Sequence, residues 1–203
     1  MTDHYFSEKP RSNIREEKFI INLLGNEIAI NSCSGLFSMR KLDFGTRLLI
    51  ENTKIDNISN DSKLLDLGCG YGIIGIAFKK KYPKLNITMI DINERAVRMA
   101  KQNCKNNNLT INIFKSDILN NSELKNELFD VITTNPPFSA GKNVCMEFIR
   151  QSYEHLNKGG KLHLVAPHNK GGDSLKKYMC EVFNNVGETA KKSGFRVYFS
   201  IKK

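Results

Sequence analysis

A glycine-rich segment, residues 66–72, follows a short apolar run that has the character of a buried strand. Its sequence, Asp-Leu-Gly-Cys-Gly-Tyr-Gly, precedes an apolar stretch with helical spacing. Glycine lets a backbone turn tightly and approach a ligand closely, and the helix N-terminus beyond it offers unpaired N–H groups and the positive end of a dipole. The segment is therefore predicted to bind a small molecule. Its candidate cofactor-binding residues are Gly68, Cys69, Gly70 and Gly72.

Two classes of ligand fit such a loop, a dinucleotide and S-adenosylmethionine. Residues 70–75 match the G-x-G-x-x-G fingerprint of dinucleotide binding. Asp66, however, lies just before the loop, where a carboxylate repels a pyrophosphate but attracts the ammonium and sulfonium groups of S-adenosylmethionine. The methionine carboxylate of that ligand can use the N–H groups of the loop. The pattern favours S-adenosylmethionine, and an NAD-dependent oxidoreductase remains the alternative.

Two further acids end the next strand-like runs. Asp91 lies 25 positions after Asp66 and can accept hydrogen bonds from both hydroxyls of a ribose. NAD enzymes place an acid similarly, so Asp91 indicates a ribose without choosing the cofactor. Asp117 can accept from an adenine amino group, with Ile92 and Ile118 against the ring, although an aspartate here is also a common turn cap.

The segment Asn-Pro-Pro-Phe, residues 135–138, directly follows a fourth strand-like run. Two prolines cannot continue a central strand, so the chain must leave the sheet here with a stiff backbone. The side-chain carbonyl of Asn135 and the backbone carbonyl of Pro136 are two fixed acceptors for an NH₂ group, and Phe138 can stack on a flat group. Asn135, Pro136, Pro137 and Phe138 are the candidate catalytic residues, and Asn135 also borders the predicted cofactor site.

Two fixed acceptors suit the methylation of an exocyclic amine. The lone pair of such an amine is delocalised into its ring. Hydrogen bonds to two carbonyl oxygens draw the nitrogen toward tetrahedral geometry and stabilise the positive charge that develops on it. Positioning is expected to supply most of the acceleration, with no strong general base needed before attack. The alternative is a plain strand-ending turn, but this turn shares a sheet edge with the glycine loop, where α/β proteins bind ligands.

The elements that must position these residues alternate between strand-like and helical patterns from residue 61 onward. Strands are predicted at 63–67, 86–90, 111–114, 129–133 and 161–165, helices at 73–82, 94–106, 144–156 and 175–183, and a terminal hairpin at 186–191 and 195–201. The alternation predicts an α/β fold with a mostly parallel sheet and helices on both faces. Residues 1–60, with a strand at 27–30 and a helix around 47–51, are predicted to form an extension packed on this core, so that residues 1–203 make one domain.

Composition and charge narrow the class of protein further. The 203 residues are 40% hydrophobic and 26% charged, as in soluble globular proteins, and no apolar run predicts a signal peptide or membrane span, so a cytoplasmic protein is expected. Five cysteines without a C-x-x-C pair, and histidines without ligand spacing, predict neither disulfides nor a metal site. The net charge is +10, and residues 141–203, with twelve basic and five acidic side chains, carry +7 of it. A basic face suits RNA, although solvated lysines alone can also produce it.

Three basic residues near the predicted ligand edge are further candidates for substrate binding, beside Phe138. Lys142 lies four positions after Phe138, and His168 and Lys170 follow the fifth strand. Each can contact a substrate phosphate. Lys142 is the better candidate, with a solvated lysine as its equal alternative, whereas a simple polar loop is the favoured interpretation of His168 and Lys170.

Together, the motifs 66–72, Asp91, Asp117 and 135–138 resemble those of class I S-adenosylmethionine-dependent methyltransferases, and the last is that of the amino-methylating branch. Segments 4–10, 34–38, 43–46 and 140–142 resemble the small single-domain relatives of the ribosomal RNA guanine 2-amino methyltransferases. The resemblance implies a Rossmann-like fold of seven strands with the last antiparallel. It also implies that Phe37, Ser38 and Thr46 cover the cofactor, although Phe37 can equally be a core aromatic.

The leading hypothesis is methyl transfer from S-adenosylmethionine to an exocyclic amine of an RNA base, first of all guanine N2 in rRNA or tRNA. The larger two-domain enzymes carry a second half without a counterpart in these residues, which leaves RNA recognition to a homodimer or to the chain's own basic surface. A protein glutamine amide and adenine N6 present the same NH₂ group and stay open as substrates. A non-catalytic RNA-binding protein is disfavoured by the intact Asp66, Asp91, Asn135 and Phe138.

Overall fold

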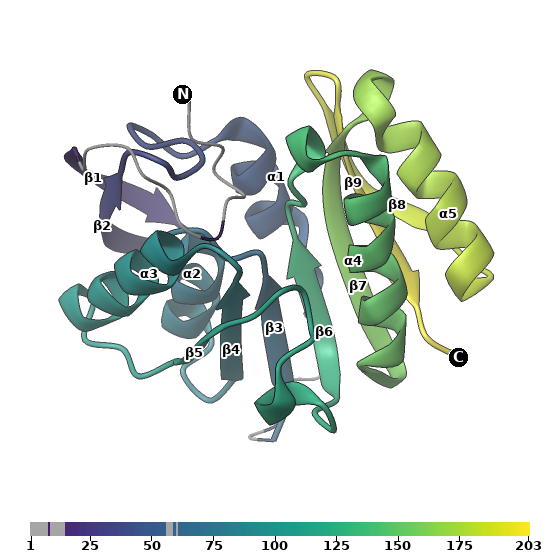
Figure 1. Cartoon of the computed structure of the whole chain (residues 1–203), viewed down its shortest axis with the longest axis horizontal. Coiled ribbons are helices and arrows are strands. Elements are labelled where there is room, and N and C mark those ends of the chain that lie inside the picture. The colour runs from purple at the N-terminus through teal and green to yellow at the C-terminus, as the bar shows by residue number, and fades with distance from the viewer. Residues whose placement is uncertain (1–7, 9–14, 56–58, 60) are drawn as a thin grey trace.

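The computed structural model describes residues 8, 15–55, 59 and 61–203, and its centre is one sheet of seven strands in the order β5-β4-β3-β6-β7-β9-β8 (Figure 1). Strands β3 to β7 pair with one another in parallel. Strand β9 is antiparallel to both β7 and β8, so β9 alone runs against the other six. The prediction of a mostly parallel sheet with an antiparallel last strand is confirmed. The strands are β3 (Lys63–Leu67), β4 (Asn86–Asp91), β5 (Asn112–Lys115), β6 (Phe129–Thr134), β7 (Leu156–Pro167), β8 (Gly187–Lys192) and β9 (Phe195–Ile201).

Helices cover both faces of this sheet, as predicted. Strand side chains alternate between faces, so Leu64 packs in the cluster under α1, α2 and α3, whereas Leu65 and Leu67 pack in the cluster under α4 and α5. The helices are α1 (Phe44–Asn52), α2 (Ile73–Lys81), α3 (Glu94–Asn106), α4 (Lys142–Glu154) and α5 (Asp173–Phe183), with short helical turns η1 (Ser122–Leu124), η2 (Phe138–Ala140) and η3 (His168–Gly172).

Strand β7 is longer than its sequence suggests. It begins at Leu156, five residues before the predicted start, and the glycine pair Gly159-Gly160 lies inside it. A Cβ on Gly160 would approach Asn157 O at 2.8 Å and Phe129 O at 3.0 Å. The pairing with β6 shifts register at this point. The glycines therefore accommodate a bulge within a strand, and not a helix end.

An antiparallel hairpin of β1 (Glu16–Leu23) and β2 (Asn26–Cys33) precedes α1. The sequence predicted part of β2 but not β1, because only Leu23 of β1 is buried and its apolar residues do not alternate. The other edge of β2 is met by asparagine side chains of α3. Asn103 accepts from Asn31 N at 2.8 Å and donates to Asn31 O at 2.8 Å, and Asn107 makes the same pair with Ala29 at 3.3 and 2.7 Å.

The helices and the cysteines of the structure bear on the expectations about membrane spans and disulfides. Within the described ranges, no helix combines the length and the apolar character needed to cross a membrane. All five cysteines are free thiols; four are buried and Cys180 is exposed. Burial raises the pKa of Cys145 to about 11 and that of Cys104 to about 12, so these thiols stay protonated near neutral pH.

Candidate functional site

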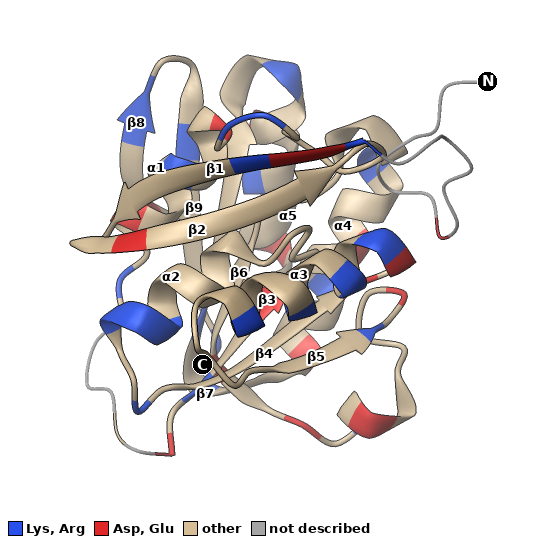
Figure 2. Ribbon diagram, turned by 90° about the vertical axis from the view of Figure 1, so that its left-hand side faces the viewer, with Lys and Arg blue, Asp and Glu red and all other residues tan. Residues whose placement is uncertain are grey.

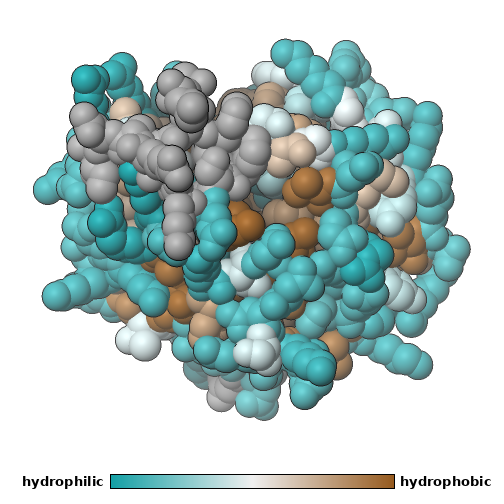
Figure 3. All heavy atoms as spheres, viewed as in Figure 1, coloured by the Kyte–Doolittle hydropathy of each residue, from teal (hydrophilic) through white to brown (hydrophobic). Residues whose placement is uncertain are grey.

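A cavity of about 520 Å³ lies at the carboxyl ends of the central strands. Figure 3 shows hydrophobic residues around a hollow in this region, bordered by hydrophilic side chains. The volume is that of a site for a small molecule. Most of the wall comes from the glycine loop after β3, the turns after β4 and β5, the Asn-Pro-Pro-Phe segment after β6, and the approach to α1, and side chains from α4, β7 and β9 complete it. The sheet edge expected from the sequence is thus the edge that carries a cavity.

The glycine loop is held in shape by its own N–H groups. Gly68 N and Cys69 N both donate to Ile90 O at 2.9 Å, Gly70 N donates to Asp91 Oδ2 at 2.8 Å, and Gly72 N donates to Cys69 O at 2.9 Å. These groups are already engaged, so they are not available to a ligand carboxylate as the sequence suggested. Gly68 and Gly70 have φ values of 74° and 56°, a left-handed conformation that favours glycine.

Asp66 lies behind the loop, and its carboxylate is fully buried. Its Oδ2 accepts from Gly75 N at 3.0 Å, while Oδ1 has no hydrogen-bond partner among the described residues. The reason is strand alternation, which turns Asp66 away from Leu65 and Leu67 toward α2. Neither Asp66 nor Gly72 is among the described residues that line the cavity. Direct contact with the cofactor was expected for both, whereas in the structure they support the loop from behind.

Burial also sets the ionisation of the two acids near the loop. Loss of hydration raises the pKa of Asp66 to about 7, against the bond from Gly75. It raises the pKa of Asp91 to about 6, against three backbone hydrogen bonds. A cation in the cavity would favour the ionised form of both carboxylates.

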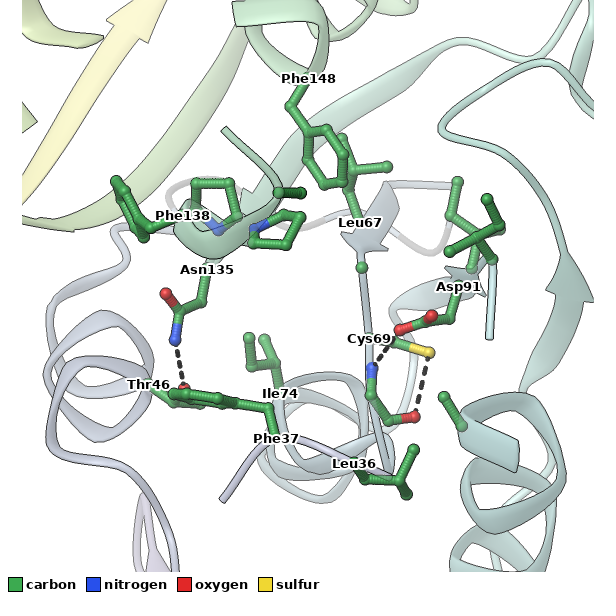
Figure 4. Close-up of a pocket in the computed structure, with 18 of the residues that line it drawn as sticks. Leu36, Phe37, Thr46, Leu67, Cys69, Ile74, Asp91, Asn135, Phe138 and Phe148 are labelled. Atoms are coloured by element: carbon green, nitrogen blue, oxygen red, sulfur yellow. Dashed lines mark hydrogen bonds between the residues drawn. The ribbon is translucent and has the colours of Figure 1, made fainter. Parts of the chain in front are cut away.

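Asp91 lines the cavity from the end of β4. Its Oδ2 accepts from Gly70 N and its Oδ1 from Asn93 N, both at 2.8 Å. Each carboxylate oxygen has a further lone pair, so the side chain is fixed in place and can still accept from two hydroxyls. Its side chain is labelled beside the glycine loop in Figure 4.

The wall beyond Asp91 contains the other predicted cofactor residues. Asp117, Ile92 and Ile118 all line the cavity. Ile118 has a φ of 51°, which is rare for a β-branched residue and is the kind of strain found at ligand sites. Ser116 also lines the cavity, and its buried hydroxyl has no partner among the described residues.

The Asn-Pro-Pro-Phe segment forms a tight turn on the opposite wall. Phe138 N donates to Pro136 O at 2.9 Å across Pro137, whose φ and ψ are −76° and 83°. The Pro136 carbonyl therefore already accepts one hydrogen bond and keeps a second lone pair. All four residues line the cavity, as the sequence predicted for a joint site with the glycine loop.

The N-terminal extension supplies the remaining wall. Phe37 lines the cavity and is 43% exposed, so it is not the core aromatic that the sequence left open. Thr46 lines it as well and accepts from Asn135 Nδ2 at 2.9 Å (Figure 4). Ser38 is not among the described lining residues; its hydroxyl donates to Lys41 O at 2.6 Å. Of the resembling segment 4–10, only Glu8 lies within the described residues.

The three basic candidates lie outside the described cavity wall. Lys142 is exposed at the first turn of α4, and Lys170 is exposed in η3. His168 Nδ1 lies 2.8 Å from Tyr198 Oη, so its ring is held against β9. The residue before it, Pro167, lines the cavity. In this placement, the three residues are able to contact only a substrate that extends beyond the cavity.

Several lining residues were missed by sequence reasoning. Asp43 and Tyr71 belong to segments that the sequence singled out, but neither residue was itself a candidate, and Ser116 directly precedes the candidate Asp117. Phe148 and Phe195 lie within predicted elements that carried no functional signal. A Cβ on Gly68 would meet the Phe148 ring at 3.3 Å, a packing relation that only the folded structure reveals.

The cavity contains no group suited to nucleophilic or metal chemistry among its described residues. Burial raises the pKa of Cys69 well above its ordinary value, and its Sγ contacts Gly70 O at 3.6 Å. No cluster of three His, Cys, Asp or Glu residues suitable for a metal occurs within the described ranges. The site offers the carboxylate of Asp91 on one wall, backed by the buried Asp66, and oxygen acceptors with an aromatic ring on the other. This arrangement suits a cationic cofactor and a neutral amine.

Comparison with known proteins gives a consistent picture. Residues 27–199 match the family described as methyltransferase small domain. The uncharacterized protein YbxB of Bacillus subtilis is 35% identical over 198 residues, 97% of each chain. Ribosomal RNA small subunit methyltransferase C of Psychromonas ingrahamii is 35% identical over 187 residues, covering 90% of this chain and 51% of its own, and that of Haemophilus influenzae is 38% identical over 179 residues, covering 84% and 50%. The chain spans about half the length of these two rRNA methyltransferases.

Solved structures share the fold. The 16S rRNA N2 G1207 methyltransferase of T. thermophilus, in complex with AdoMet and guanosine, superposes with a TM-score of 0.81 at 24% identity, covering 96% of this chain and 52% of that one. A methyltransferase from Pyrococcus furiosus superposes with a TM-score of 0.59 at 24% identity, covering 68% and 74%. These likenesses show the Rossmann-like methyltransferase fold that the strand order also displays.

Proposed function

The chain belongs to the methyltransferase small domain family and is an S-adenosylmethionine-dependent enzyme, and from this premise we propose that it methylates an exocyclic amine of an RNA base. Guanine N2 in ribosomal RNA is the first candidate, by analogy with the relatives named as rRNA methyltransferases and with the structurally similar 16S rRNA N2 G1207 methyltransferase. Because the chain belongs to a methyltransferase family, an NAD-dependent oxidoreductase is no longer an alternative.

The observation that carries the proposal is that one cavity contains both Asp91 and the segment from Asn135 to Phe138. S-adenosylmethionine, when bound, supplies a methyl group on a positively charged sulfur. Asp91 is placed to hold the ribose, with Ile92, Ile118 and Asp117 beside the adenine and the acids of the loop favouring positive charge. The fit is chemical: the Asp91 carboxylate in the lining, with the buried Asp66 behind it, suits a cation, and the isoleucines of the next turns suit a flat ring.

The acceptor wall acts on the amine. Asn135 Oδ1 and Pro136 O are both oxygen acceptors at the cavity, and an NH₂ group has two hydrogens to donate. Holding both hydrogens orients the nitrogen lone pair and stabilises the charge that it gains as the new bond forms. The aromatic rings of Phe138, Phe37 and Phe195 also line the cavity, and rings of this kind stack on an unpaired base.

Charge favours RNA over a peptide. The net charge is +10, and on the face shown in Figure 2 lysine and arginine occur on several elements, including α2, α3 and β8. Neutralising phosphates with such residues supplies sequence-independent affinity that falls as salt rises. A glutamine amide presents the same NH₂ group but gains nothing from this charge.

The test is the transfer of labelled methyl from S-adenosylmethionine to total unmethylated RNA, followed by nucleoside analysis. We expect label in 2-methylguanosine with the wild type, none with Asn135→Ala, and normal transfer with Asn157→Ala. Asn157 is the matched control because its amide donates to Asp130 in β6, away from the cavity. Label in 6-methyladenosine would change the base. Label only in glutamine-containing protein would overturn the RNA proposal.

A further inference from the structure

We propose that Asp43 and Thr46 are positioning residues that orient the Asn135 side chain so that its oxygen, and not its nitrogen, faces the substrate amine. The inference rests on the proposed function for its chemistry. Its geometry is independent of the substrate, because it concerns hydrogen bonds within the chain. Both residues come from the N-terminal extension, more than 80 positions before Asn135.

The three side chains form one hydrogen-bonded network. Asn135 Nδ2 donates to Thr46 Oγ1 at 2.9 Å and to Asp43 Oδ2 at 3.1 Å. Thr46 Oγ1 in turn donates to Asp43 Oδ2 at 2.9 Å. All three residues line the cavity. The two acceptor oxygens are only 2.9 Å apart, so they lie on the same side of the amide nitrogen and share one of its hydrogens.

This network decides which end of the amide faces the cavity. An asparagine can rotate by half a turn and exchange its oxygen for its nitrogen with little change in shape. An ionised carboxylate only accepts hydrogen bonds, so Asp43 requires the nitrogen on its side. In Figure 4 the Asn135 nitrogen points toward Thr46, and the oxygen lies on the side of Phe138. The amide oxygen is then the acceptor that the side chain offers to a ligand.

Asp43 is itself held by the start of α1. It is the N-cap of that helix, and its Oδ2 accepts from Thr46 N at 2.7 Å. The same Oδ2 also accepts from Thr46 Oγ1 at 2.9 Å, so the groups bonded to it are all donors. A Cβ on Gly45 would meet the Phe195 ring at 3.0 Å and Asp43 Oδ2 at 3.2 Å. The cap is thus closely packed, with little room for the carboxylate to move.

The orientation has a direct chemical consequence. With its nitrogen turned inward, Asn135 would present two donors to the two donors of an amine, and that contact is repulsive. A side chain without its partners would sample both orientations, because terminal amide torsions are broad and roughly two-fold. Asp43 and Thr46 therefore act on the rate through Asn135 and touch neither cofactor nor substrate in this role.

The experiment compares two threonines of the same helix. Thr46→Val removes the hydroxyl that accepts from Asn135, and Thr53→Val removes one that donates to Leu49 O at 2.8 Å at the far end of α1. We expect Thr46→Val to lower kcat on RNA about tenfold, the effect of one net hydrogen bond, with unchanged cofactor affinity. Thr46→Ser should restore kcat, and Thr53→Val should leave it within about twofold. Melting temperatures of all variants control for loss of folding.

A second variant separates the helix cap from the orientation of the amide. Asp43→Ser keeps a good N-cap but is too short to reach Asn135. It should lower kcat about 30-fold, since a bond to a charged group is lost. Asn135→Ala should remove the effect of Thr46→Val, because residues that act through one another are not additive.

A readout without any RNA keeps the inference testable if the proposed function is wrong. The side-chain amide of Asn135 can be followed by NMR, assigned by its absence in Asn135→Ala. Its hydrogens should exchange about tenfold faster in Thr46→Val than in the wild type, and at the wild-type rate in Thr53→Val. Equal exchange in both valine variants, together with equal kcat where transfer is observed, would overturn the inference. A wild type that methylates no RNA but shows the exchange difference would overturn only the proposed substrate.

Discussion

The cavity has a cofactor wall, formed by the glycine loop and Asp91, and an acceptor wall, formed by residues 135–138. The two walls differ in the sequence separation of the hydrogen bonds that hold them in place. On the cofactor wall, the hydrogen bond from Gly75 N to Asp66 joins residues nine positions apart, and that from Gly70 N to Asp91 joins residues 21 positions apart. On the acceptor wall, Asn135 bonds Thr46 across 89 positions and Asp43 across 92. The cofactor wall is assembled from consecutive strand–loop–helix units, whereas the acceptor wall depends on a segment added before them.

The walls differ in charge as well. The cofactor wall is backed by two carboxylates whose pKa burial raises, to about 7 for Asp66 and about 6 for Asp91. The acceptor wall offers an amide oxygen, a backbone carbonyl and aromatic rings, and the Asp43 carboxylate there already accepts from Asn135 Nδ2 and Thr46 N. A cation and a neutral amine thus meet different surroundings within one cavity, and substitutions on the two walls should separate binding of the cofactor from the rate of transfer.

The largest expected effect is on the acceptor wall. Asn135→Ala should lower kcat about 100- to 1,000-fold, as the loss of one fixed transition-state contact does in other enzymes, while the cofactor Kd changes less than about threefold. Single-turnover methyl transfer and calorimetric titration measure the two quantities. A large rise in cofactor Kd would show that the walls are not separable at Asn135.

The next effect is on the cofactor wall. Asp91→Asn should weaken cofactor binding about 100-fold, because an amide nitrogen would face the Gly70 N–H and the charged acceptor for the ribose is lost. Asp130→Asn is the matched control, since both oxygens of Asp130 also accept hydrogen bonds, from Lys63 N and Asn157 Nδ2, away from the cavity. Cofactor Kd is measured by calorimetry. Equal Kd values for the two variants would remove Asp91 from the ribose site.

This contrast explains how much the sequence could predict. The spacing of glycines and acids after successive strands is local, so the sheet, its order of motifs and most of the cofactor wall followed from it. The bond from Thr46 to Asn135 depends on where the extension packs, and no local pattern records that. Strand β1 was missed for a related reason, since Phe19–Ile21 shows no alternation to mark a buried face.

The structure differs from the prediction at other places because one residue type occurs in more than one structural setting. The pair Gly159-Gly160 is typical of a helix end and equally of a bulge, and only the pairing of β7 with β6 decides between them. Asp66 precedes the loop as expected, but strand alternation directs its carboxylate to Gly75 instead of the cavity. The sequence located this acid without revealing the face it uses.

A smaller effect should appear on varying pH. The raised pKa values mean that Asp66 and Asp91 are partly protonated below pH 7, and a cationic cofactor prefers them ionised. Cofactor affinity should therefore rise about tenfold between pH 5.5 and 7.5, and less in Asp91→Asn. In the ligand-free protein the sign is opposite: these groups contribute stability below about pH 4, and it is lost as pH rises through 6 to 7.

The pH prediction has two measurements. Calorimetry gives the cofactor Kd across the range, and thermal unfolding gives the melting temperature with and without cofactor. The stabilisation by cofactor should be larger at pH 7.5 than at pH 5.5. A flat Kd across this window would mean that neither acid changes ionisation on binding.

The smallest expected effect concerns the boundary between the walls. Phe37 is 43% exposed, and we expect Phe37→Ala to raise the cofactor Kd about fivefold, toward the lower end for one stacking contact. Leu128→Ala is the control, because Leu128 is also 43% exposed but lies outside the described lining. A raised KM for RNA with an unchanged cofactor Kd would instead assign Phe37 to the acceptor wall.

The asparagines of α3 have a consequence for how the hairpin is placed. Four helical residues advance about 6 Å and two strand residues about 6.7 Å, so Asn103 and Asn107 can match Asn31 and Ala29 together. A slip of β2 by one residue would break both pairs at once and turn its buried side chains outward. The two side-chain amides therefore fix the register of β2 against α3. They also occupy the hydrogen-bonding edge at which another chain could add a strand, which protects β2 from edge-to-edge aggregation.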